Sequence, residues 1–217
     1  MENHQSSDVS VLTLEACVES LMEALHAEKE GAHRLELCSR LDLDGLTPDT
    51  ELTRNLLDAV KIPVKVMIRP RAGDFYYTES EVGFMAEQIQ SFKESGVFGV
   101  VFGMLEKDDR LNISQIEYLA KVARPLEVTI HKAIDLCDDP LNEIRKLKRT
   151  GLVHAVLSSG AAPTAREGQI MLRNMIREAG EDIRIIAAGK ITAQNLPELH
   201  RAIGAREYHG RSIVNYK

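Results

Sequence analysis

The chain has 217 residues and a formal net charge of -6; 44% of its residues are hydrophobic and 28% are charged. These values fit one soluble globular domain with a sizeable core. The acidic balance, without a block of Lys or Arg, argues against nucleic acid or an anionic membrane as the main partner. Residues 1–10 are polar and are expected to form a flexible N-terminus, followed by a single domain over 11–217.

The cysteine content indicates a reducing compartment. Cys17, Cys38 and Cys137 are too few and too scattered for a disulfide framework, and no Cys-x-x-Cys pair occurs. No apolar stretch is long enough to span a bilayer, and the start of the chain lacks a secretory pattern. A cytoplasmic location is therefore expected.

Short β-rich runs alternate with amphipathic helical runs along the whole chain. In chain order, the predicted elements are strand 12–18, helix 20–30, strand 34–38, helix 48–60, strand 64–68, helix 79–95, strand 99–102, helix 114–123, strand 127–131, helix 140–150, strand 155–158, helix 164–179, strand 183–187, helix 195–202 and strand 207–209. Thr47 is the expected N-cap of the second helix, which has Pro48 in its first turn.

Eight strands at a spacing of roughly 27 residues predict an α/β fold, a single-domain (β/α)8 TIM barrel. The rival is an open doubly wound sheet, which typically carries a glycine-rich turn after its first strand. Residues 17–20 contain no glycine, which favours the barrel.

The inward faces of the predicted strands carry charged residues where a barrel usually has branched aliphatic ones. Buried charges are costly unless they are paired, so opposite signs on neighbouring strands suggest mutual neutralisation. The deeper ones are interpreted as a structural ion network; the inward set is Glu15, Glu36, Lys65, Arg69, His131, Glu207 and His209.

Residues at the carboxyl ends of the strands should surround the barrel mouth, where sites of this fold lie. Cys17 and Cys38 end adjacent strands, and neighbouring strands are ~4.8 Å apart, so two thiolates there could share a soft ion such as Cu(I). Each cysteine alone would be interpreted as packing. His131 and His209 end two further strands and could bind, catalyse or simply line the mouth.

Two loops add candidate anion-binding groups. Arg69 and Arg71 follow the third strand, and guanidinium groups suit carboxylate or phosphate. The structural alternative pairs Arg69 with Glu36 and Arg71 with Asp74. Small residues at 158–160 and 188–189 would allow close backbone approach, a weak signal by itself.

Several segments in order resemble the CutC copper homeostasis family, and the likeness runs from about residue 12 to 209. The run Met-Ile-Arg-Pro-Arg followed by Gly-Asp-Phe is the most specific; the segments are 15–20, 34–38, 45–48, 66–71, 73–75, 99–103 and 131–135. The resemblance implies a (β/α)8 barrel in the cytoplasm, a role in copper handling with Cys17 and Cys38 as Cu(I) ligands, and a homo-oligomer (dimer or tetramer).

The chain departs from this family's pattern at several positions. Three glycines usual after the seventh strand are Ala188, Gly189 and Lys190 here, which weakens a backbone phosphate site, although Lys190 could itself supply charge. The usual His-Arg-Ala-Phe-Asp segment reads His-Lys-Ala-Ile-Asp at 131–135.

Three hypotheses stay open at the level of sequence. The first is Cu(I) binding by Cys17 and Cys38, with Met67 as a soft third ligand. The second is a barrel enzyme acting on a small anionic metabolite. In it, His131 and His209 act as acid and base, Glu36 orients a partner, and the anion is held by Arg69, Arg71, Asp135 and Ser158. The third is a structural role in an oligomer.

Overall fold

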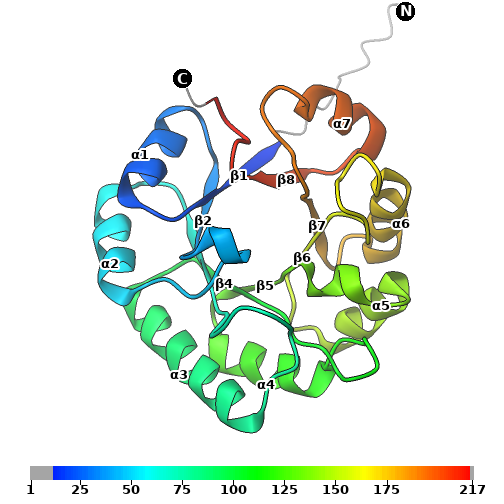
Figure 1. Ribbon diagram of the computed structural model, residues 1–217, viewed down its shortest axis with the longest axis horizontal. Coiled ribbons are helices and arrows are strands. Elements are labelled where there is room, and N and C mark those ends of the chain that lie inside the picture. Colours follow the sequence, from blue (N-terminus) through cyan, green and yellow to red (C-terminus); the bar gives the residue numbers. More distant parts are fainter. Residues whose placement is uncertain (1–11, 216–217) are drawn as a thin grey trace, which may run out of the picture.

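The computed structural model describes residues 12–215, so the expected flexible segment 1–10 lies outside the described residues. Eight parallel strands form a closed ring, in which each strand pairs with the next in sequence and β8 pairs with β1. Helices surround the ring, as seen down the barrel in Figure 1. The predicted single-domain (β/α)8 barrel is confirmed.

The elements lie close to their predicted places. The strands are β1 Thr13–Val18, β2 Arg34–Leu37, β3 Val64–Met67, β4 Gly99–Phe102, β5 Glu127–Ile130, β6 Ala155–Ser158, β7 Arg184–Ala187 and β8 Glu207–Gly210. The helices are α1 Leu21–Lys29, α2 Thr50–Ala59, α3 Glu79–Ser95, α4 Ile113–Ala123, α5 Pro140–Thr150, α6 Gln169–Ala179 and α7 Leu196–Ile203, with two 3-10 turns, η1 Leu41–Leu43 and η2 Lys132–Leu136.

Local signals fix the best-predicted helices. Thr78 caps α3 and forms a reciprocal capping box with Glu81, and Gly96 ends the helix in the left-handed conformation. Asp139 caps α5, which starts with a proline and ends at Gly151. These signals depend on a few adjacent residues, which is why both helices match their predicted bounds.

Two helices begin more than one residue later than predicted. Asp49, not Thr47, caps α2, because the Thr47 hydroxyl instead accepts a hydrogen bond from the backbone N–H of Arg69. The helix predicted over 164–179 begins at residue 169. A first turn does form from Thr164, but Gly168 packs directly against the backbone of Gly160, and the regular helix starts only after that contact.

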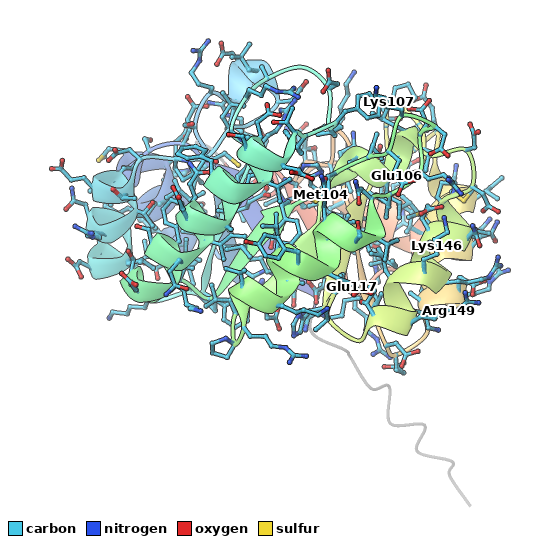
Figure 2. All side chains as sticks on the ribbon, turned by 90° about the horizontal axis from the view of Figure 1, so that it is seen from below. Met104, Glu106, Lys107, Glu117, Lys146 and Arg149 are labelled. Atoms are coloured by element: carbon cyan, nitrogen blue, oxygen red, sulfur yellow. The ribbon has the colours of Figure 1, made fainter. Side chains whose placement is uncertain are left out.

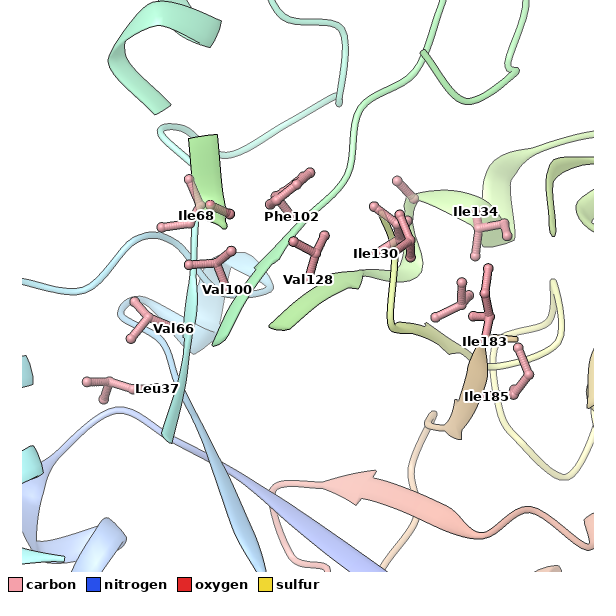
Figure 3. Close-up of a cluster of buried hydrophobic side chains, with 14 of the residues drawn as sticks. Leu37, Val66, Ile68, Val100, Phe102, Val128, Ile130, Ile134, Ile183 and Ile185 are labelled. Carbon is pink, nitrogen blue, oxygen red and sulfur yellow. The ribbon is translucent and has the colours of Figure 1, made fainter. Parts of the chain in front are cut away.

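The apolar core lies between the strands and the helices. The outward strand residues labelled in Figure 3 are all buried in one cluster, and they include Val66, Val100 and Val128. Charged side chains such as Lys146 and Arg149 project from the outer face of α5 (Figure 2). Among residues 12–215, no helix has the length and apolar character needed to cross a bilayer.

The interior of the ring is charged, as predicted. Arg34 bonds to the carboxylates of both Glu15 and Glu207, and the Lys65 ammonium lies 3.7 Å from Glu15 and 2.8 Å from the Thr129 hydroxyl. Arg184 extends this network at the amino-terminal end of the barrel, where it contacts Glu207 and Glu127. Lys65 and Glu15 are fully buried, so each depends on its partners for compensation.

Candidate functional site at the barrel mouth

A cavity of about 750 Å³ opens at the carboxyl ends of the strands. Predicted site residues come together along its lining: Cys17, Glu36, Cys38, Met67, Arg69, His131, Asp135 and His209. Its volume lies in the range of small-molecule sites and far exceeds the space that one metal ion fills.

The two thiols meet in a small apolar cluster at the base of the cavity. Cys17 Sγ lies 3.8 Å from Cys38 Sγ, and Met67 and Val101 pack beside them. A hydrogen bond between the sulfurs lowers the pKa of Cys17 to about 6 and raises the pKa of Cys38 well above its usual range. Near neutral pH the pair therefore holds one proton, and Cys17 is the thiolate.

His209 joins the thiols to the ion network below them. Its Nδ1 lies 3.0 Å from a Glu15 oxygen, and its Nε2 lies 3.4 Å from Glu36 Oε2. Burial opposes a charge on the ring, but Glu36, Cys17 and Glu15 outweigh burial and raise the pKa of His209 well above its usual value. His209 therefore acts as a buried cation beside the Cys17 thiolate.

Glu36 and Glu15 face the interior from adjacent strands, but their environments differ. Burial alone would raise the pKa of Glu15, yet Lys65, His209 and Arg34 hold it well below its usual range. Burial, the largest cause, raises the pKa of Glu36 to about 8 with help from Cys17 and Glu15, and His209 and Lys65 offset only part of this rise. Glu36 Oε1 is buried and has no hydrogen-bond partner within residues 12–215, so it can serve an incoming ion or ligand.

His131 is a neutral hydrogen-bond donor. Its Nδ1 accepts from the backbone N–H of Ala133, which leaves the proton on Nε2. Burial, reinforced by Arg69, lowers the pKa of His131 to about 3. Nε2 is buried and lacks a partner in the described chain, and the ring packs on Phe75 at 4.7 Å between centroids. This environment fits a donor to a ligand better than a group that takes up protons.

The two arginines after β3 are engaged with the protein. Arg69 donates to the carbonyl oxygens of Leu43, Gly45 and Gly73, so the structural alternative that pairs it with Glu36 is wrong. Its buried Nε has no partner within residues 12–215, although its guanidinium lies over the Phe75 ring.

Arg71 lies outside the cavity lining. It pairs with Asp74, as the structural alternative predicted, and also with Glu81. These contacts occupy its guanidinium and turn it away from the position expected of an anion ligand.

Asp135 and Ser158 hold a loop together. Asp135 accepts hydrogen bonds from the Ser158 and Ser159 hydroxyls and from the backbone N–H groups of Ser159 and Ala161. Ser158 is fully buried and lies behind the cavity wall. Both residues shape the loop after β6, and Asp135 alone of the two lines the cavity.

Sequence reasoning missed part of the cavity wall. Lys132 and Leu136 both line it, as does Leu41 from η1. Lys132 directly follows a predicted strand and Leu136 lies in the same loop, so their place in the chain was an available signal. Cys137 is buried in the outer core and bonds to the Ala133 carbonyl, away from the other two cysteines.

The sequence matches the CutC family over residues 12–214. The chain belongs to the CutC family. A relative from Pasteurella multocida (strain Pm70), named family protein CutC, is 38% identical over 91% of this chain and 81% of its own length. The human copper homeostasis protein cutC homolog is 38% identical over 90% of this chain and 71% of its own length.

A solved CutC structure shares the fold. The crystal structure of the putative copper homeostasis protein CutC from Streptococcus agalactiae superposes with a TM-score of 0.88 at 27% identity and covers 94% of this chain and all of that one. The CutC resemblance inferred from the sequence motifs is confirmed.

Two overlapping groups of side chains in this CutC chain have metal-ligand geometry. The ligand atoms of Cys17, Glu36 and Cys38 lie within 4.8 Å of one another, and so do those of Glu15, Glu36 and His209. The first group contains two sulfur ligands, which soft ions prefer. The second group has no sulfur, and its His209 Nδ1 already lies 3.0 Å from Glu15, so the first is the better candidate site.

Proposed function

We propose that this chain binds Cu(I) at the barrel mouth and serves in cellular copper handling. The observation that carries the proposal is the pair of buried thiols 3.8 Å apart at the base of an open cavity. Thiolates and thioethers select Cu(I) over harder ions, and a lowered thiol pKa at Cys17 supplies a thiolate near neutral pH. The human relative named for copper homeostasis supports the same assignment.

The sulfur separation favours a third ligand. Two metal–sulfur bonds of ~2.3 Å that span 3.8 Å meet at roughly 110°. This angle is bent, so an ion held at this spacing has room for another ligand. Met67 lies in the same cluster and offers a soft thioether, whereas Glu36 offers a hard oxygen. We therefore assign Met67 as the third Cu(I) ligand.

An anaerobic titration tests this proposal. The reduced protein is titrated with Cu(I) against a competing chelator, in parallel with the Cys17→Ser/Cys38→Ser double variant. We expect one Cu(I) per chain in the wild type and its loss in the double variant. Cys137→Ser is the matched control, because this buried cysteine lies outside the cavity lining, and it should bind as the wild type does. Equal binding by the double variant, or none by the wild type, would contradict the proposal.

X-ray absorption at the copper edge tests the third ligand. Met67→Leu keeps the volume of the side chain but removes the sulfur. We expect three sulfur neighbours around copper in the wild type and two in Met67→Leu. Two sulfur neighbours in both proteins would exclude Met67 and leave the thiolates alone.

A cytoplasmic location and a homo-oligomer, either dimer or tetramer, complete the proposal. A reducing compartment keeps Cys17 and Cys38 available as thiols, which Cu(I) binding needs. Light scattering during size-exclusion chromatography measures the mass in solution against 24.2 kDa for one chain. A monomeric mass at micromolar concentration would contradict the oligomer.

A second candidate function is a barrel enzyme acting on a small anionic metabolite. The specific observation is that Cys17 and Glu36, with pKa values of about 6 and 8, stand beside the His209 cation in one cavity. Groups that titrate near neutral pH are typical of acid–base sites. Solvent deuterium entering a candidate metabolite, followed by NMR, would reveal proton abstraction, and Glu36→Gln should abolish it. Deuterium entry at an equal rate in that variant would contradict the role of Glu36.

A further inference from the structure

The mouth cavity contains polar groups that a copper site leaves unused. Nε2 of His131 is buried, carries a proton and has no partner within residues 12–215. The ring is held in place by its Nδ1 hydrogen bond and by Phe75, and a Cβ at Gly103 would lie only 2.7 Å from Nδ1. A donor fixed this firmly and left unsatisfied calls for a ligand that brings an acceptor oxygen.

Lys190 supplies a charge at the same cavity. It lines the wall at the end of β7, and its ammonium forms no ion pair with any of the described residues. Two neighbouring cations have acidic partners. Lys132 lies 4.0 Å from Asp135, and Arg211 lies 3.1 Å from Glu23. Lys190 is therefore available to an anion entering from solvent.

The backbone at Lys190 is strained. Its φ is +56°, directly after Gly189 at +104°, and its carbonyl is fixed by the Asn195 side-chain amide at 2.9 Å. A residue with a side chain is less stable than glycine in this conformation. Residues held in this region cluster at functional sites. The strained backbone and the unpaired charge therefore occur at the same residue of the cavity wall.

Apolar side chains complete the wall. Leu41, Phe75, Leu136 and Leu157 line the cavity, and Leu136 is 58% exposed. A pocket with an apolar wall and a few convergent polar groups is typical of sites for small organic molecules. A bare inorganic anion would leave this wall uncovered.

We propose that the mouth cavity binds a small organic anion, whose carboxylate or phosphate group is held by Lys190 and whose body accepts a hydrogen bond from His131 Nε2. This binding needs neither copper nor a reaction, because both side chains are separate from the thiol pair. Lys190 takes the role that the sequence suggested for Arg71, because the guanidinium of Arg71 is paired with Glu81 and Asp74.

A thermal-shift screen of carboxylated and phosphorylated metabolites tests the proposal first. Citrate and glucose 6-phosphate distinguish the two kinds of anionic group, and glucose is the neutral control. We expect members of one anionic class to raise the melting temperature and glucose to leave it unchanged. A screen in which no anionic compound stabilises the protein overturns the proposal.

Variants then locate the binding by calorimetry with the best anion from the screen. Lys190→Gly removes the charge and relieves the strained φ, so it should fold at least as well as the wild type and bind about tenfold more weakly. His131→Asn keeps an acceptor for the Ala133 N–H but loses Nε2–H, and should weaken binding roughly fivefold. Lys121→Ala, on the outer surface of α4 beside Glu117, is the control for lost positive charge.

The outcomes separate this proposal from copper binding. The Cys17→Ser/Cys38→Ser variant should lose Cu(I) but bind the anion within about twofold of the wild type. Lys190→Gly should bind Cu(I) as the wild type does but bind the anion about tenfold more weakly. Wild-type affinity for the anion in both Lys190→Gly and His131→Asn overturns the assigned site, whatever the copper result.

Discussion

Replacing Glu36 with Gln should stabilise this protein, although it removes a charged residue from the barrel interior. The pKa of Glu36 is about 8 in the folded chain against an ordinary value of 4.5. Above pH 4.5 the unfolded chain releases the proton while the folded chain keeps it, so the folded state loses stability as pH rises towards 8. Each pH unit in this window costs about 1.4 kcal/mol, which gives about 3 kcal/mol at pH 7. Gln avoids this cost.

Glu15 provides the matched contrast one strand away. Its pKa is held well below the usual range by Lys65, His209 and Arg34, so its charge stabilises the fold above pH 4.5 and this contribution is lost on acidification. Glu15→Gln removes the one carboxylate that Arg34, Lys65 and His209 share, and should cost about 3–5 kcal/mol. Two buried carboxylates on adjacent strands should thus respond in opposite directions to the same substitution.

Urea unfolding of the three proteins from pH 4.5 to 9 measures both effects. The difference in unfolding free energy between Glu36→Gln and wild type should grow from near zero at pH 4.5 and level off above pH 8. Subtracting the wild-type value removes the pH dependence that comes from groups titrating in both proteins. A Glu36→Gln variant that is less stable than wild type at pH 7, or a difference that does not change with pH, would refute the reasoning.

Three further predictions concern the cavity wall and its loops. Arg69→Ala leaves three carbonyl groups without their donor and should lower the unfolding free energy by about 3 kcal/mol in urea, whereas a loss under 1 kcal/mol would show that water replaces it. Gly160→Ala, at φ +76°, places a Cβ 2.3 Å from the Gly168 carbonyl oxygen and should lower the unfolding free energy by more than ~2 kcal/mol. Its control Gly151→Ala, at φ +62° in open space, should lower it by only ~1 kcal/mol, and equal losses in the two variants would contradict the close contact. The pKa of His131 is about 3 in the folded chain, below its ordinary value of 6.5, so its contribution to stability is present above pH 6.5 and is lost on acidification. The unfolding free energy of the wild type should therefore fall by about 2 kcal/mol relative to that of His131→Asn between pH 6.5 and 5. Unfolding free energies of the two proteins that change in parallel with pH would refute this.

The sequence predicted the barrel well because its evidence was repeated along the chain. Alternation of strands and helices, and capping residues such as Thr78 and Gly96, depend on neighbours in sequence. The inward residues followed from the two-residue period of the strands. The start of α6 could not be predicted this way, because the contact between Gly160 and Gly168 exists only once the loop has closed.

Strand periodicity predicted that most candidate residues lie at the barrel mouth, but it did not predict all of their contacts. Cys17 and Cys38 were expected at the mouth because each ends a predicted strand, and the structure places their sulfurs in contact. The contacts of Arg71 could not be predicted, because Arg71 lies in the loop after β3 and its partner Glu81 lies on the next helix. The neutral state of His131 depends on burial, which strand periodicity does not measure.

The charged interior has a consequence for how the strands find their alignment. Seven of the eight strands have only four residues, so each offers about two inward positions and little apolar surface to define its place. If β3 slid by one residue, Lys65 would leave Glu15 and Thr129 and enter the apolar layer under the helices. The free-energy cost of that unpaired charge exceeds what a shifted aliphatic residue would cost. Buried ions thus supply the specificity that such short strands cannot obtain from shape alone.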